Sequence, residues 1–186
     1  MSLRTATRLG IFLFFLIPVD SCFAGEEEPI VWVAEGVSIR ETKQIELYPV
    51  TDGTRGKSGF DVIDQITNTV RTELTRAGLG IHQPVKGQET GNIGIRISLV
   101  QYQPGNVGGR WAGLGGGAAL CIIRANILDG ASGKVISDII VAEQVEGGGL
   151  FSIGAGKYVP TRAARKIAGE LAGLFGIELK PGEVSE

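Results

Sequence analysis

Three runs of alternating apolar and polar residues constrain the fold more than any other feature of this chain. In residues 92–102, isoleucine or leucine stands at positions 93, 95, 97 and 99, and glycine, arginine, serine and valine alternate with them. This period of two is typical of a strand with one buried side. Residues 118–128 and 134–145 are the other two runs, and residues 129–133, DGASG, supply the turn between them. The sequence therefore predicts an antiparallel hairpin next to a third strand.

Two amphipathic segments are expected to form helices that cover the buried side of these strands. Residues 58–77 begin with the capping residue Ser58, repeat apolar residues at steps of three and four, and end before Gly78. A second stripe of this kind runs from about residue 160 to 175. An antiparallel-rich mixed sheet with both helices on one face buries every apolar stripe. We therefore expect an α+β fold, a two-layer sandwich.

The length of 186 residues allows one ordinary domain. We expect a signal peptide at residues 1–24. Residues 25–57 are expected to hold the N-terminal strand of the domain, at residues 30–39, and a connecting loop. A further short strand is expected within residues 45–50. Residues 58–178 complete the same domain, and residues 179–186 form a polar tail.

The N-terminus has a basic start and an apolar core at residues 10–19, which is too short to span a membrane and fits a secretory signal. Two processing routes are open. Cleavage before Gly25 would leave small residues one and three positions before the cut. Alternatively, residues 19–22 imitate a lipobox in which Cys22 is the candidate lipidation site, although Asp20 departs from that pattern. Either route predicts a periplasmic or outer-membrane-associated protein.

Charge and cysteine content exclude several classes of protein. Removal of residues 1–24 takes two of the 18 basic and one of the 20 acidic residues and leaves a net charge of −3, so no nucleic acid partner is expected. Cys121 is then the only certain cysteine, which excludes internal disulfides. It alternates with apolar residues in its strand, and no basic residue adjoins it. This pattern predicts a buried hydrophobic side chain and not a reactive thiol.

Three segments resemble catalytic or nucleotide-binding motifs, but each lacks a part. Residues 113–118 match the dinucleotide fingerprint, yet a strand is expected after them where the motif needs a helix. Residues 51–58 resemble a P-loop without its first glycine, and a helix cap already explains Ser58. Residues 150–154 resemble a nucleophile elbow, but His82 is the sole histidine and is expected in a surface loop. We therefore expect no enzyme, with no catalytic residue, cofactor or metal site.

Large apolar side chains occur in two glycine-rich loops, residues 104–117 and 147–156. Such side chains either fold back under the domain or form a surface for a partner or a membrane, and both interpretations stay open. If they are exposed, the two loops could form one apolar patch. The candidate partner-binding residues are Trp111, Leu114, Leu150, Phe151 and Ile153.

Residues 95–151 carry a family resemblance. The run ISLVQYQPGNVGGRWAGLGGGAA, the later LDGASGKVI and the final GGGLF resemble a family of bacterial envelope proteins known as domain of unknown function 4410, many of which are lipoproteins. The resemblance covers the C-terminal two thirds of the mature chain. It implies helices packed on a small mixed sheet, similar to the N-terminal domain of TolB, and it implies no enzymatic activity. The imperfect lipobox departs from the lipid-anchored form common in the family.

The first hypothesis is an exported, non-catalytic protein that binds another envelope protein or polymer, through the glycine-rich loops or by strand addition at the sheet edge. The alternative is a subunit of an oligomeric secretion or pore-like assembly at the outer membrane, although Arg96, Arg124 and Asp138 interrupt a lipid-facing surface. A hydrolase or a nucleotide-binding enzyme is the least supported class. The sequence leaves the partner, the pathway and the oligomeric state open.

Overall fold

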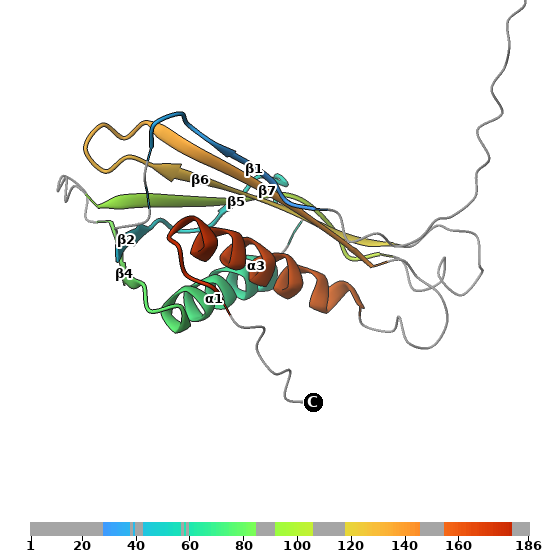
Figure 1. Ribbon diagram of the computed structural model, residues 1–186. Coiled ribbons are helices and arrows are strands. Elements are labelled where there is room, and N and C mark those ends of the chain that lie inside the picture. The colour runs from blue at the N-terminus through green and yellow to red at the C-terminus, as the bar shows by residue number, and fades with distance from the viewer. Residues whose placement is uncertain are drawn as a thin grey trace, which may run out of the picture.

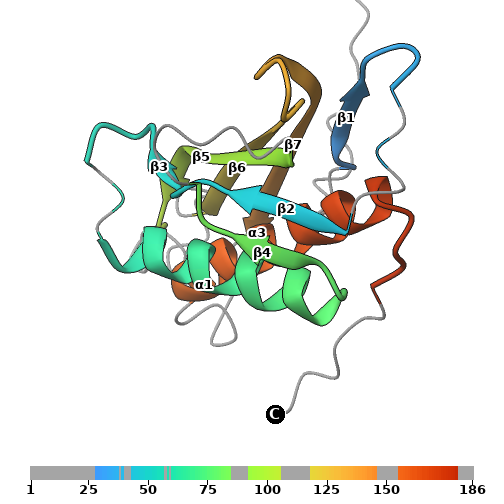
Figure 2. The same ribbon diagram turned by 90° about the vertical axis from the view of Figure 1, so that its left-hand side faces the viewer.

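The computed structural model describes residues 28–37, 39, 43–56, 58, 60–84, 92–105, 118–145 and 155–179. Within these residues it contains a seven-stranded mixed sheet and the helices α1, Phe60–Arg76, and α3, Ala155–Leu174 (Figure 1). The strands are β1 (Ile30–Val33), β2 (Gln44–Leu47), β3 (Thr51–Asp52), β4 (Gly80–His82), β5 (Ile93–Gln103), β6 (Ala119–Leu128) and β7 (Val135–Val145). Both helices lie on the same face of the sheet (Figures 1 and 2). The expected α+β architecture is confirmed.

The strand order is β1-β7-β6-β5-β2-β4, and β3 pairs with β5 outside this path. Strands β5, β6 and β7 form an antiparallel meander, and β1 adds antiparallel to β7. Strand β2 pairs in parallel with β4 and with β5, and β3 pairs in parallel with β5. Helix α1 lies in the crossover that the parallel pair of β2 and β4 requires. The turn between β6 and β7 is closed by the Asp129 N–H, which donates to the Lys134 carbonyl at 2.8 Å. Gly133 has φ +65° there, so the turn prediction is confirmed.

The core lies between the sheet and the two helices. Every second side chain is 0–1% exposed in residues 95–99 of β5, 119–127 of β6 and 137–141 of β7, and α3 presents the stripe expected from the sequence. Each large aliphatic side chain buried in this way stabilises the fold by about 1.5–3 kcal/mol. The fully buried set includes Ile95, Ile97, Leu99, Cys121, Ile123, Ile127, Ile139 and Val141 on the sheet, with Ile66, Val70, Leu74, Ile167 and Leu171 on the helices.

Helix α3 begins at Ala155, earlier than the expected residue 160, and so contains Pro160. Proline has no N–H, so it cannot donate to the carbonyl of the residue four positions before it, Gly156. The Tyr102 hydroxyl donates to that carbonyl instead, at 3.0 Å. A side chain from β5 thus supplies the missing donor and fixes the start of α3 to the sheet.

The N-terminal part of the domain differs more from the expectation. The first strand, expected at residues 30–39, ends at Val33, because the chain turns at Gly36 with φ +77°. Strands β3 and β4 were not expected from the sequence, since they are only two and three residues long. The placement of His82 in a loop is wrong: it lies on β4, exposed, and its Nε2 contacts Gln44 Oε1 on β2.

Candidate functional site

The five loop residues proposed for partner binding, Trp111, Leu114, Leu150, Phe151 and Ile153, lie outside the described residues, as does Cys22. The described residues that lead into the two glycine-rich loops meet at one end of the sheet. The register pairs Gln103 with Leu120 and Ala119 with Val145. A Cβ added to Gly156 would lie 2.3 Å from the Pro104 carbonyl oxygen, so the start of α3 packs directly on the end of β5. The described residues on either side of both loops therefore lie at the same end of the sheet.

Residues 113–117 and 150–154 of the motif-like segments lie outside the described residues, so only their neighbours and most of the P-loop-like segment are placed. Strand β6 begins at Ala119, so no helix follows the dinucleotide-like fingerprint. In the P-loop-like segment, the Asp52 carboxylate accepts hydrogen bonds from Thr54 and from the Ser58 hydroxyl, the latter at 2.7 Å. These hydrogen bonds, that from the Thr54 hydroxyl first, lower the pKa of Asp52. The Ser58 hydroxyl therefore donates to Asp52, and the helix cap expected at Ser58 is not seen among the described residues.

Cys121 is fully buried, as expected from its place in the alternation. Burial, and then the negative charge of Glu143 opposite it on β7, raises the pKa of the thiol from 9.0 to about 12. A thiolate is the nucleophilic form of cysteine, so this environment suppresses its reactivity. Among the described residues, no group of three or more His, Cys, Asp or Glu side chains is arranged to hold a metal ion.

The face of the sheet opposite the helices has no covering helix or strand layer among the described residues (Figures 1 and 2). We call it the open face. The register pairs Trp32 with Asp138 and Ile30 with Ile140, which places these four side chains on it. Ile30 is 67% exposed, Trp32 52% and Val100 47%. Apolar exposure on this scale, spread along one face of one sheet, is typical of an interaction surface.

Strand β1 is the part of this surface that the sequence did not reveal. Its four residues, IVWV, suggest a buried strand, yet every one of them is exposed. It pairs with β7 on one side, where the Ser137 hydroxyl also donates to the Trp32 carbonyl at 2.7 Å, and no described strand pairs with its other side. The sequence of an apolar strand does not show whether the strand lies at the edge of the sheet, so its exposure can be recognised only from the strand order. Such an edge can receive a strand from a partner.

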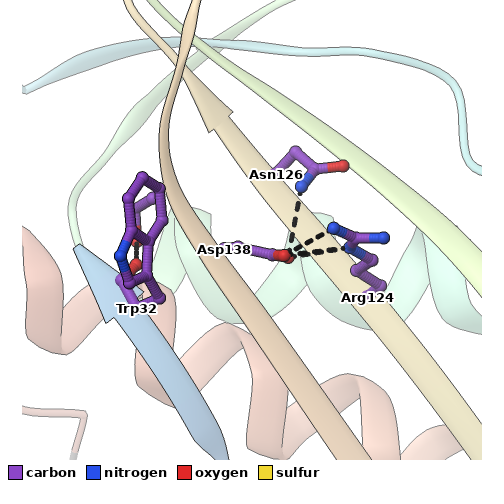
Figure 3. A network of polar contacts seen from close by, with 5 residues as sticks. Trp32, Arg124, Asn126 and Asp138 are labelled. Atoms are coloured by element: carbon purple, nitrogen blue, oxygen red, sulfur yellow. Dashed lines mark hydrogen bonds and ion pairs between the residues drawn. The ribbon is translucent and has the colours of Figure 1, made fainter. Parts of the chain in front are cut away.

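A polar network crosses the open face beside Trp32 (Figure 3). Asp138 reaches from β7 to the Arg124 guanidinium, with Nε 2.9 Å from Oδ1 and Nη2 2.6 Å from Oδ2. Asn126 donates to Oδ1 at 3.1 Å. The hydrogen bond and the charge of Asp138 raise the pKa of Arg124. The two charges neutralise each other, so the surface between Trp32 and β5 is polar without a net charge.

No family model and no curated protein matches this chain. Among solved structures, a Xanthomonas campestris protein described as DUF330 is 13% identical with a TM-score of 0.51 and covers 78% of this chain and 93% of its own. A hypothetical protein of Chlamydia trachomatis is 10% identical with a TM-score of 0.51, over 73% of this chain and 99% of its own. A Neisseria meningitidis lipoprotein is 13% identical with a TM-score of 0.42, over 67% and 97%. At these identities the first two show a shared fold. In the part of the chain that the structure describes, no helix is long and apolar enough to cross a membrane.

Proposed function

We propose that this chain is an exported, non-catalytic envelope protein that serves as a binding or assembly module for another envelope protein or polymer. The open face and the free edge of β1 are its docking surface. The signal-like residues 1–24 and the resemblance to family 4410 support the location, and the lipobox-like segment around Cys22 supports a lipid anchor. No family model matches the chain, so membership of family 4410 stays a prediction.

The observation that carries this proposal is the exposure of Ile30 and Trp32 on an edge strand. Folded domains usually protect such edges with charged residues, bulges or a covering element, because unpaired strands associate with other chains. The run IVWV contains no charged residue, and no described element covers it. Tryptophan is also among the residues that most often carry the binding energy of an interface.

Site-specific photocrosslinking in intact cells tests this role. A photoreactive residue at position 32 should capture one discrete envelope component, and the same residue at position 158 should not. Tyr158 is a matched control, since it is 67% exposed but lies on α3, away from the open face. Equal capture at both positions, or none at position 32, would contradict the proposed surface.

The glycine-rich loops need a separate experiment because their residues lie outside the described part of the chain. The variant carrying Trp111→Ser and Phe151→Ser should weaken partner capture with little change in melting temperature if these side chains are exposed. A large fall in melting temperature would instead place both residues in the core and restrict docking to the open face.

A further inference from the structure

The outer edge of β1 presents backbone hydrogen-bonding groups to which no described strand is paired. The Ala34 N–H donates to the Ile136 carbonyl of β7 at 2.9 Å, so the even-numbered residues of this segment bond with β7. In an antiparallel strand the N–H and C=O groups of successive residues point to opposite edges. The N–H and C=O groups of Val31 and Val33 therefore point away from β7, toward a position where a further strand would fit.

Both faces of β1 beside this edge are apolar. Ile30 and Trp32 lie on the open face, whereas Val31 and Val33 point to the helix side, because Val31 pairs with the fully buried Ile139. The two valines are nevertheless 40% and 39% exposed, so the helix layer does not cover them. A strand that completes this edge is therefore expected to be uncharged and apolar on both of its faces. Strand β1 itself, with the sequence IVWV, meets this requirement.

The residues at the two ends of β1 select one register for the pairing of two copies. Antiparallel pairing about a two-fold axis must set outward-pointing residues opposite one another. With Val31 of each copy opposite Val33 of the other, the free N–H and C=O groups of both strands all find partners. A shift of two residues toward the N-terminus would set Val33 opposite Pro29, which has no N–H to donate. A shift the other way would need residue 35, where the chain already turns toward Gly36, with φ +77°.

This register sets Trp32 opposite Trp32 of the second copy. The pair is of the non-hydrogen-bonded kind, in which the side chains of opposite residues approach most closely. Pairs of aromatic side chains across two strands stabilise antiparallel sheets. Trp32 is 52% exposed in the single chain, so the pair would also remove apolar surface from water. The strand has no charged residue, so no like charges would oppose each other across the contact.

We propose that β1 pairs edge to edge with β1 of a second copy of this chain and so joins two sheets into one. The inference rests on the proposed role of β1 as a docking edge and names its occupant. The edge is 4 residues long, far fewer than the roughly 20–30 residues a side of a standard interface, so the dissociation constant is expected at about 10 µM to 1 mM. The two-fold axis leaves both open faces on the same side of the joined sheet, where another envelope component can dock.

Disulfide trapping tests the register. The chain from Gly25 onward, with Cys121→Ala, receives one cysteine as Trp32→Cys or as Ile30→Cys. Cysteines at position 32 would face each other with Cα atoms about 4.5 Å apart, within reach of a disulfide, whereas those at position 30 would be more than about 13 Å apart. Under mild oxidation, Trp32→Cys should form dimers at least about tenfold faster than Ile30→Cys on non-reducing gels. Equal rates, or no dimer from Trp32→Cys, overturn the inference.

Sedimentation of the unmodified chain from Gly25 onward keeps Trp32 in place. Its average mass should rise between about 10 µM and 1 mM. Val31→Lys puts a charge on the edge and should keep the chain monomeric, whereas Val135→Lys, at a valine of similar exposure (46% against 40%) beside the β6–β7 turn, should not. A monomer at about 1 mM, or an equal effect of both lysines, overturns the inference. Photocapture of a different envelope component at position 32 would then still support the proposed docking role.

Discussion

The two faces of strands β5, β6 and β7 have the same backbone but opposite roles. Ile139 is fully buried against the helices, and its neighbour Ile140 points to the open face and is partly exposed. Cys121 and Ile122 differ in the same way on β6. Apolar residues therefore occur on both faces, but a second layer covers only one of them in the described structure. The comparison separates the residues that stabilise the fold from those available to a partner.

Ion pairs differ between the two faces as well. On the covered face, Glu143 is 6% exposed and lies 3.3 Å from the Arg162 and 3.2 Å from the Lys166 side-chain nitrogens. This contact joins β7 to α3. On the open face, Arg124 and Asp138 join two neighbouring strands, with side chains 47% and 21% exposed. The first pair fixes a helix to the sheet, whereas solvent screens the second.

The largest expected difference between the faces is in thiol reactivity. With Cys22 replaced by serine, Cys121 should react with a maleimide only when the domain opens. The variant Ile122→Cys with Cys121→Ala places the thiol one residue away, on the open face, and should react about 10³–10⁴ times faster. Labelling kinetics followed by mass spectrometry measure the ratio. Similar rates for both thiols would mean that the covered face is not sealed.

The burial of Cys121 also predicts how the stability of the fold depends on pH. The folded state raises the pKa of Cys121 from 9.0 to about 12, so the unfolded chain releases the thiol proton first. Stability that depends on the neutral thiol is complete below pH 9 and declines between about pH 9 and 12. The Cys121→Ala variant, which cannot titrate there, serves as the control and should show a smaller decline in urea denaturation.

Substitutions of the neighbouring isoleucines on β7 should give the next largest difference. Ile139→Ala removes buried methyl groups and should lower the free energy of unfolding by about 2–5 kcal/mol. Ile140→Ala removes the same atoms from a partly exposed site and should cost under about 1 kcal/mol. Chemical denaturation of both variants measures this contrast. Equal losses would imply that another layer covers the open face.

The sequence was sufficient to predict the covered face. Alternation in β5, β6 and β7 and the apolar stripe of α3 place Cys121 and Ile139 in the core. An apolar residue at every second position can be buried together only on one face of a strand, so the pattern predicts both the element and its buried side. The turn at residues 129–133 was predictable from local residue preferences. These features depend on neighbours in sequence, and the structure agrees to within a few residues in each strand.

The candidate sites could not be predicted in the same way. Trp32 looks like a core residue in the sequence, and its exposure follows from the edge position of β1, which is a property of the whole sheet. Parallel pairing of β2 with β5 sets Glu46 beside Gly94, forty-eight positions later, and no local pattern encodes that pairing. The early start of α3 depends likewise on Tyr102, a distant donor to the Gly156 carbonyl.

The smallest expected difference concerns the two ion pairs. Glu143→Ala should cost about 1–3 kcal/mol, because Lys166 loses a partner in a largely buried position. Asp138→Ala should cost about 0.2–1 kcal/mol, since its partner Arg124 is half exposed and can be solvated. Double-mutant cycles with Lys166→Met and Arg124→Met isolate the coupling in each pair. A coupling as strong for Asp138 as for Glu143 would mean that water is excluded from the open face, and the surface offered to a partner would already be occupied.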